Sequence, residues 1–233
     1  MAVVRAFRGV RAVPGRVNPG ALAAVDVDAA VRDPRNVVAL LGGEEARAKF
    51  LLKEQFRAGV VARDPLPALY VLKVQGETSR TGFFAVVRAD SLDTDVVADP
   101  ARTDRLRGTG VGIEPVVISY VDKKGRVARS LDSETEREPD ASFDLDGKAC
   151  ELWAIDDDSA AARVTALVEG QALTITSGGA ALAAQRALVN ADENAEPNDD
   201  AAGYALAFFV DEESPVDVVP IGVVLHALEG SLA

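Results

Sequence analysis

The sequence predicts an α/β fold in which a mixed sheet contains several hairpins and is flanked by helices. Short β-branched segments, separated by turn residues, outnumber the segments with helical periodicity. These strands do not alternate regularly with helices, as they would in a doubly wound fold. The 233 residues suffice for a single compact domain over 1–233, and two lobes, 1–95 and 96–233, are the alternative division.

The N-terminal part of the chain is expected to contain a strand, a helix and a hairpin. Hydrophobicity alternates over residues 2–13, which is typical of a strand. A helix is predicted over 42–58, because apolar residues recur there at helical spacing and Gly59 suits its C-terminal end. Residues 68–74 and 82–87 are apolar runs on either side of a turn and predict a hairpin.

The middle of the chain is expected to add further strands. Residues 115–120 predict a strand that turns into a second strand over 126–130. The charged segment 132–140 predicts an exposed loop. Residues 143–146 and 150–155 predict another hairpin.

Three adjacent aspartates, residues 156–158, precede a helix predicted over 160–168. Adjacent carboxylates suggest a metal site, but calcium loops separate their ligands with other residues. One aspartate can instead cap the helix while the others lie near its first turn, where negative charge is favourable. We therefore expect a capped helix and no metal site here.

Paired carboxylates are another candidate for chemistry. The acids considered for acid–base catalysis are Glu134, Glu136, Asp156 and Asp157. A catalytic carboxylate needs burial to raise its pKa, and these segments are typical of solvated surface. The sequence therefore favours surface acids over a catalytic pair.

Residues 173–186 predict a strand, a Gly-Gly turn and an alanine-rich helix. The first amides of a helix are unpaired and its N-terminus is positive, so Ser177, Gly178 and Gly179 form a candidate anion site. The alternative is that the two glycines only let the strand turn into the helix. Beyond this unit we expect a polar loop over 192–200. Two closing strands are expected over 204–210 and 216–219.

Charge and hydropathy restrict the classes of function. A net charge of −12 disfavours binding to nucleic acid or to an anionic membrane surface, because both require a cationic face. No apolar run reaches the roughly 20 residues of a membrane span. Arginines interrupt the apolar N-terminal segment, so no signal peptide is predicted and a cytoplasmic location is expected.

The chain has one cysteine and one histidine. Because Cys150 is the only cysteine, no intrachain disulfide can form. Cys150 is expected to lie half-buried beside Trp153 in a strand. His226 lies in an apolar run, where a packed or surface histidine is commoner than a catalytic base. Because the usual transition-metal ligand sets cannot be assembled from one residue of each kind, no metal site is predicted.

Several segments, taken in order, match the motifs of one protein family. Residues 175–181 correspond to a central motif IADGHHR, and residues 102–107 to the end of a HERT segment. The other matching segments are 7–11 (FRAVRP), 55–61 and 67–72 (ALYVYR), 115–120, 152–156 (LWRV-D), 204–210 and 219–224 (LPYNRVV). On these residues the chain resembles the domain-of-unknown-function 1015 family, prokaryotic proteins related to the ParB/sulfiredoxin superfamily. The resemblance implies a ParB/sulfiredoxin-like core.

The resemblance also implies a chemistry, because the superfamily includes nucleotide-dependent kinases that phosphorylate free serine. Such a kinase is expected to carry an acidic base and a His/Arg clamp for the phosphate. In this chain, Ser177 stands at the Asp position of the motif and Ala181 at the Arg position. Gly179 and Ala180 stand at the two His positions. Since phosphoryl transfer depends on positioning and charge stabilisation, their loss should abolish it.

Other motif positions have changed in the same way. Pro100 and Ala101 stand at the His-Glu positions of the HERT segment, and Val223 stands at the Arg position of the last motif. Apolar framework positions are retained while polar ones are lost. The sequence therefore favours a non-catalytic binding, regulatory or assembly subunit with no catalytic residues and no required cofactor. A homodimer, or a complex with a full-length homologue, is the expected assembly.

The alternative function is a residual nucleotide- or phosphate-binding enzyme of the free serine kinase type. Its candidate site for ATP, ADP or phosphate consists of Ser177, Gly178, Gly179, Arg102, Thr103 and Arg105. The hydroxyls donate hydrogen bonds, the glycines let the backbone approach an anion, and the arginines supply positive charge. The competing interpretation places these arginines in solvent.

Overall fold

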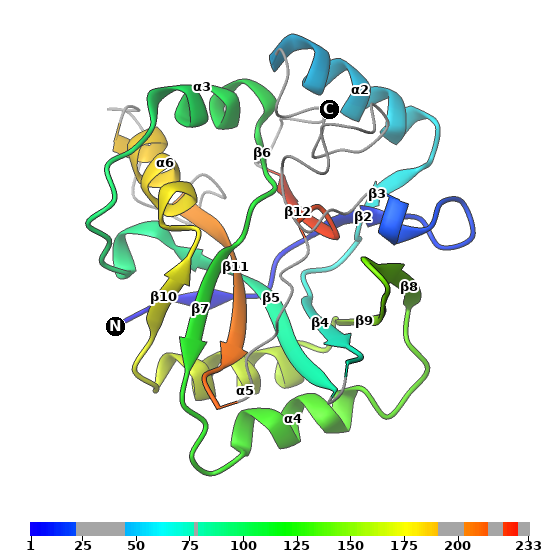
Figure 1. Ribbon diagram of the computed structural model, residues 1–233, viewed down its shortest axis with the longest axis vertical. Coiled ribbons are helices and arrows are strands. Elements are labelled where there is room, and N and C mark those ends of the chain that lie inside the picture. The colour runs from blue at the N-terminus through cyan, green and yellow to red at the C-terminus, as the bar shows by residue number, and fades with distance from the viewer. Residues whose placement is uncertain (22–44, 77–78, 191–202, 214–220, 228–233) are drawn as a thin grey trace.

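The computed structural model describes residues 1–21, 45–76, 79–190, 203–213 and 221–227. Among these residues, eight strands form a large sheet in the order β10-β7-β11-β5-β4-β9-β8, with β1 also paired to β5 (Figure 1). β7 and β11 are parallel, and the other neighbours in this sheet are antiparallel. The strands are β1 (Val4–Arg5), β4 (Leu69–Val74), β5 (Arg80–Arg88), β7 (Val116–Tyr120), β8 (Ala141–Leu145), β9 (Lys148–Ile155), β10 (Thr174–Ser177) and β11 (Tyr204–Asp211). The predicted α/β class with a mixed sheet is confirmed.

Both predicted hairpins of this sheet are present, as β4 with β5 and β8 with β9. Between β8 and β9, Asp146 and Gly147 have φ values of 53° and 75°. Positive φ at both central residues is what a tight two-residue hairpin turn requires. The local turn chemistry therefore accounts for the correct prediction.

A second, four-stranded sheet has the order β3-β2-β12-β6. Its strands are β2 (Val10–Ala12), β3 (Val61–Arg63), β6 (Val111–Gly112) and β12 (Val224–Ala227). The prediction of one strand over residues 2–13 was therefore wrong, because β1 and β2 belong to different sheets. The Gly9 amide donates to the Phe7 carbonyl (3.1 Å) and to the Tyr70 hydroxyl (2.7 Å), which turns the chain from one sheet to the other.

Five α-helices are described, together with two short 3₁₀ helices, within the ranges given above. They are α2 (Glu45–Arg57), α3 (Pro100–Thr109), α4 (Arg126–Glu134), α5 (Asp158–Glu169) and α6 (Gly179–Asn190), with η1 (Pro19–Ala21) and η2 (Ala89–Ser91). Figure 1 shows α4 and α5 side by side at the bottom of the view and α3 above α6 at the upper left. Within the described part of the chain, no helix is long and apolar enough to cross a membrane.

The large sheet is buried on both faces. Phe83 of β5 stacks on Phe209 of β11 (ring centroids 5.0 Å apart) in the core that α4, α5 and α6 cover. The neighbouring residues Phe84 and Phe208 point to the opposite face of the sheet, and their ring centroids lie 4.6 Å apart. They belong to a second core, together with Phe7 and part of β12. Strands from both sides of residue 95 thus share one sheet, while the number of domains stays a prediction.

Residues 126–130 form the first part of α4 and not the predicted strand. The Asp122 carboxylate accepts hydrogen bonds from the amides of Arg126, Val127 and Ala128 at 2.8, 2.7 and 3.1 Å. These are otherwise unpaired amides of a helix start, and Val127 then buries its side chain against α5. α4 continues to Glu134, so the loop predicted over 132–140 was wrong in its first residues.

Three predictions concern residues outside the described ranges. These are the start of the helix over 42–44, the polar loop over 192–200 and the strand over 216–219. β12, which begins at Val224, was not predicted as a strand of this sheet.

Replacing Asp122 by Ala should lower the free energy of unfolding by about 2 kcal/mol, because three amides at the start of α4 would lose their common acceptor. Urea unfolding followed by circular dichroism measures the change. Asp132→Ala, at an exposed position of the same helix, is the matched control and should change stability little. Equal effects of the two substitutions would contradict this account of α4.

Candidate functional site

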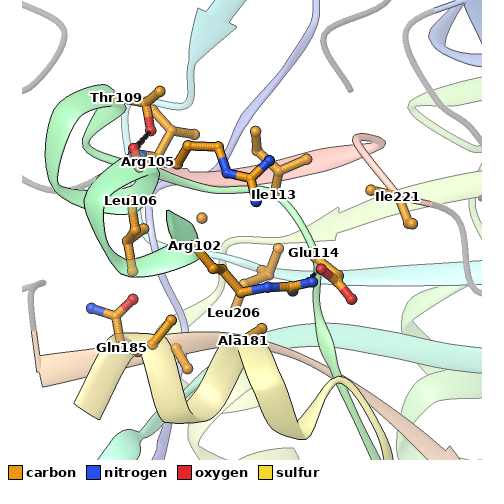
Figure 2. Close-up of a pocket in the computed structure, with 14 residues that line it drawn as sticks. Arg102, Arg105, Leu106, Thr109, Ile113, Glu114, Ala181, Gln185, Leu206 and Ile221 are labelled. Carbon is orange, nitrogen blue, oxygen red and sulfur yellow. Dashed lines mark hydrogen bonds and ion pairs between the residues drawn. The ribbon is translucent and has the colours of Figure 1, made fainter. Parts of the chain in front are cut away.

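A pocket of about 260 Å³ lies between α3 and α6. α3 contributes Arg102, Arg105 and Leu106, and α6 contributes Ala181, Ala184 and Gln185. Residues around β6, from β11 and at Ile221 complete the lining (Figure 2). Segments that are far apart in the sequence therefore meet at one concave surface, as is typical of ligand sites.

The polar groups of this pocket come mainly from α3. Figure 2 shows Arg102 and Arg105 extending from α3 across the pocket, with the Arg102 guanidinium directed at Glu114. Arg102 Nη1 donates to Glu114 Oε2, and both side chains are about one-third exposed. The Thr109 hydroxyl donates to the Arg105 carbonyl at 2.7 Å. Two guanidinium groups and one carboxylate therefore line the pocket, and the carboxylate of Glu114 is paired with Arg102.

The remaining walls are apolar or small. Ala181 and Ala184 present methyl groups from α6, and Leu106, Ile113 and Leu206 lie around them. A pocket with apolar walls and a few convergent polar groups matches the general character of small-molecule sites. The volume is just below the roughly 300–1,000 Å³ of drug-sized sites, so a compact ligand fits it best.

Only two of the six predicted site residues line this pocket, namely Arg102 and Arg105. Thr103 is buried in α3, and its hydroxyl donates to the Asp99 carbonyl at 3.1 Å. That hydroxyl is therefore occupied within its own helix. Arg102 and Arg105 do not lie in open solvent, as the competing interpretation expected, since both line a concavity.

Ser177, Gly178 and Gly179 connect β10 to α6 and are not among the lining residues. Gly178 has a φ of 75°, and a Cβ atom there would lie 2.6 Å from the Pro115 carbonyl oxygen. Both facts require glycine for structural reasons alone. A Cβ atom on Gly179 would lie 3.0 Å from the Val96 side chain, so the loop before α3 lies against the start of α6. The turn explanation accounts for these glycines.

The sequence did not predict Glu114, Leu106, Gln185 or Ile221 as site residues, although they line the pocket. Glu114 directly precedes the predicted strand at 115–120, and only its pairing with Arg102 distinguishes it from other surface acids. Arg186 of α6 was also missed. Its guanidinium donates to the carbonyls of Ala89 and Leu92, which ties α6 to η2.

The acids considered for catalysis have structural contacts. Asp157 accepts a hydrogen bond from the Ala160 amide at 2.8 Å and caps α5, as the sequence predicted. Glu134 pairs with Arg163 at 3.0 Å. Glu136 and Asp156 are exposed. No group of three or more potential metal ligands occurs among the residues that the structure describes.

Cys150 is buried in β9, more deeply than the half-buried position predicted for it. Burial, and to a smaller extent the nearby Asp144 carboxylate, raise the pKa of the thiol to about 11. The side chain is therefore a neutral thiol at physiological pH and packs in the apolar core with Phe143 and Leu152.

His226 is buried in β12, which agrees with a packed rather than a surface histidine. Its ring meets Phe7 edge-on (ring centroids 5.7 Å apart). Within the described structure, Nδ1 of His226 has no hydrogen-bond partner. Burial, and to a smaller extent the positive charge of Arg63, together lower the pKa of His226 to about 4, so the ring is neutral at physiological pH.

Comparison with known proteins supports the family suggested by the motifs. A model of the family described as "Protein of unknown function (DUF1015)" matches residues 25–232. No significant match was found among curated proteins or among solved structures.

Replacing Gly178 by Ala should lower the free energy of unfolding by about 3 kcal/mol, since the new Cβ atom meets both a left-handed φ and the backbone of Pro115. Gly147→Ala is the matched control, because Gly147 has the same φ of 75° but nothing within 4 Å of its Cβ position. The control should cost only about 1 kcal/mol. Chemical denaturation of both variants checks this, and similar losses would argue against close packing at Gly178.

Stability should depend on pH through His226. Its pKa in the folded chain lies below its value of 6.5 in the absence of burial, so the unfolded state takes up the proton first. Stability is therefore fully present above pH 6.5 and decreases as the pH falls toward 4. Between pH 7.5 and pH 5 this residue alone should cost about 2 kcal/mol.

His226→Phe removes the titrating group while keeping an aromatic ring beside Phe7. Denaturant unfolding of both proteins at pH 7.5 and pH 5 isolates the histidine, because the carboxylates titrate equally in each. The wild-type protein should lose about 2 kcal/mol more than the variant. Identical pH dependence in the two proteins would show that His226 accepts a proton readily when folded.

Proposed function

The chain belongs to the DUF1015 family, whose function is unknown, and from this premise we propose that it is a non-catalytic binding subunit. The pocket between α3 and α6 is its ligand site. The ligand is a compact organic molecule with one anionic group and an apolar body.

The observation that carries this proposal is the chemistry of the pocket lining. Three segments that resemble family motifs contribute to it, through Arg102 of α3, Ala181 of α6 and Ile221 near β12. Ala181 offers a methyl group at the position where the resembled motif has Arg. Among the described lining residues there is no His, Cys, Ser, Lys or Asp, and the single carboxylate, Glu114, is already paired with Arg102. Such a lining can bind a ligand but offers few groups that could transfer a proton or a phosphoryl group.

The ligand chemistry follows from the positions of charge and apolar surface. Arg102 and Arg105 lie on one wall, where they would bind a carboxylate or phosphate group. Leu106, Ile113 and Leu206 would contact the apolar body of the ligand. Glu114 limits the net positive charge of the site, which favours a ligand with a single anionic group over a nucleoside di- or triphosphate.

The second candidate is a residual nucleotide- or phosphate-binding enzyme of the free serine kinase type, with a ParB/sulfiredoxin-like core. The two arginines at the pocket are the observation that favours it. Against it, the Gly178 turn is accounted for by its backbone geometry, and Thr103 is hydrogen-bonded within α3. We therefore place binding without catalysis first.

A protein partner is part of this proposal. A non-catalytic subunit exerts its effect through the molecule it binds to, and the expected partner is a second copy or a full-length homologue. Light scattering of the purified chain, alone and with a ligand of the pocket, tests for the binding of a second copy.

The test is a binding screen by calorimetry with branched aliphatic carboxylates, aliphatic phosphate monoesters, phosphoserine, ADP and ATP. Each carboxylate is measured beside its neutral amide. We expect a small carboxylate or monoester to bind about tenfold more tightly than its neutral analogue, because charge-assisted hydrogen bonds to arginine are lost in the amide.

Ala181→Leu fills the pocket and should weaken this binding at least about tenfold. Ala162→Leu, the same substitution at an exposed position of α5, is the matched control and should leave the affinity unchanged. Equal affinity in the Ala181→Leu variant would refute the assignment of the pocket. Transfer of phosphate from ATP or ADP to free serine would refute the non-catalytic role.

A further inference from the structure

A groove of about 380 Å³ lies between α4 and α5, the two helices that Figure 1 shows side by side at the bottom of the view. Its lining consists of three arginines, two serines and a leucine, namely Arg126, Arg129, Ser130, Ser133, Arg163 and Leu167. None of these residues carries a carboxylate, although the chain has 37 acidic and 25 basic residues. The groove is therefore a local concentration of positive charge on an acidic protein.

The positive charge extends along the chain just before the groove. Residues 123–131 contain four cations and no acid, because Lys123 and Lys124 precede Arg126 and Arg129. All four of these residues are exposed. Within the part of the chain that the structure describes, the guanidinium groups of Arg126 and Arg129 make no hydrogen bond and no ion pair. Both groups are therefore available to a binding partner.

The acids nearest in the sequence do not pair with these two arginines. Asp122 is buried, and its carboxylate accepts hydrogen bonds from three backbone amides at the start of α4. Glu134 pairs with Arg163 at 3.0 Å, so one of the three guanidinium groups in the groove is already balanced. Asp132 is exposed on α4 and does not line the groove.

The distribution of charge along α4 opposes the dipole of that helix. The N-terminus of a helix is positive, so acids are favourable in its first turn and cations in its last turn. α4 has no acid in its first turn and no cation in its last turn, and it runs from Arg126 to Glu134. A Cβ atom on Gly125 would lie 3.2 Å from Arg129 Nη1, so this guanidinium also lies near the start of the helix.

The stability of α4 therefore does not explain why Arg126 and Arg129 are at its N-terminal end. Departures from the local rules of stability are typical of functional surfaces, where binding compensates for the unfavourable arrangement. An anionic partner at this groove would neutralise the cations and the positive end of the helix together.

The groove suits an acidic protein segment better than a small metabolite. Arg126, Arg129, Ser133 and Arg163 are exposed, so a ligand bound there would keep one side in water. A small-molecule site instead encloses most of the surface of its ligand. Guanidinium groups spaced along a helix can pair with successive carboxylates of a peptide, whose geometry matches that of arginine. Charge complementarity thus favours a partner rich in aspartate and glutamate.

We propose that this groove docks an acidic segment of a protein partner, whose carboxylates pair with Arg126 and Arg129. The inference rests on the role of binding subunit proposed above, and it supplies the surface through which that subunit contacts its partner. It does not depend on the ligand of the pocket between α3 and α6, because the two sites share no lining residue. Nucleic acid is a less suitable polyanion, since a long strand would continue onto the surface of a chain with a net charge of −12.

Fluorescence anisotropy with a labelled oligoglutamate peptide measures this docking directly on the purified chain. Oligoglutamine of the same length is the neutral control, and oligouridylate is the control for a different polyanion. Oligoglutamate should bind at least about tenfold more tightly than either control. Its affinity should fall as the salt concentration rises, because salt screens ion pairs at an exposed surface.

The double variant Arg126→Gln/Arg129→Gln should weaken oligoglutamate binding at least about tenfold, because both available guanidinium groups are lost. The matched control is Arg16→Gln/Arg57→Gln, which removes the same charge from exposed positions outside the groove. The control should bind oligoglutamate within about twofold of the wild type, since it changes only the long-range field.

Urea unfolding of the same variants separates a docking role from a structural one. The Arg126→Gln/Arg129→Gln variant should unfold at a urea concentration no lower than that of the wild type, because cations are removed from the positive end of α4. A lower midpoint in this variant, but not in the control, would show that the arginines stabilise the fold and would overturn the proposal.

Three binding results would also overturn it. These are equal binding of oligoglutamate and oligoglutamine, binding of oligouridylate as tight as that of oligoglutamate, and equal affinity in the double variant and its control. Ala181→Leu should leave oligoglutamate binding unchanged, because Ala181 lies in the other site. Loss of the pocket ligand with retained peptide binding would contradict only the pocket assignment, and the reverse result would contradict only the docking groove.

Discussion

The register between β5 and β11 is the constraint on which the rest of the structure depends. These two strands place Phe83 and Phe209 in one core and Phe84 and Phe208 in the other. Gly82 is necessary for it, because a Cβ atom there would lie 2.4 Å from Phe208 Cζ. A shift of one strand by one residue relative to the other would turn its side chains to the opposite face of the sheet. Each aromatic ring would then lie in the other core. β7 pairs with β11 and β10 with β7, so the position of α6 follows from the same register.

The pocket between α3 and α6 is a consequence of this arrangement. Close approach of Gly178 to Pro115 determines where β10 ends and α6 begins. From that start, Ala181 and Ala184 reach the space beneath α3, where Leu206 of β11 forms part of the lining. α6 presents small alanine side chains and α3 presents long arginine side chains, and the space between the two helices is not filled by either. The pocket is thus built into the packing of the helices on the sheet edge.

The positive charge of the pocket between α3 and α6 is partly balanced from within. Glu114 pairs with Arg102, so an incoming anion competes with a carboxylate already present.

The sequence by itself determined the α/β class, the two hairpins, the cap of α5 at Asp157 and the glycine turn before α6, because each depends on contacts within a few residues. It also indicated the family through ordered motifs. Only the tertiary structure decided that residues 2–13 divide between two sheets. It also decided that Arg102 pairs with Glu114, while the Thr103 hydroxyl is hydrogen-bonded within α3. In the same way, β12 places His226 at one concavity with arginines of β1 and β3. These outcomes depend on contacts between distant segments, whose geometry is set by strand register and helix packing and leaves no periodic trace in the local sequence.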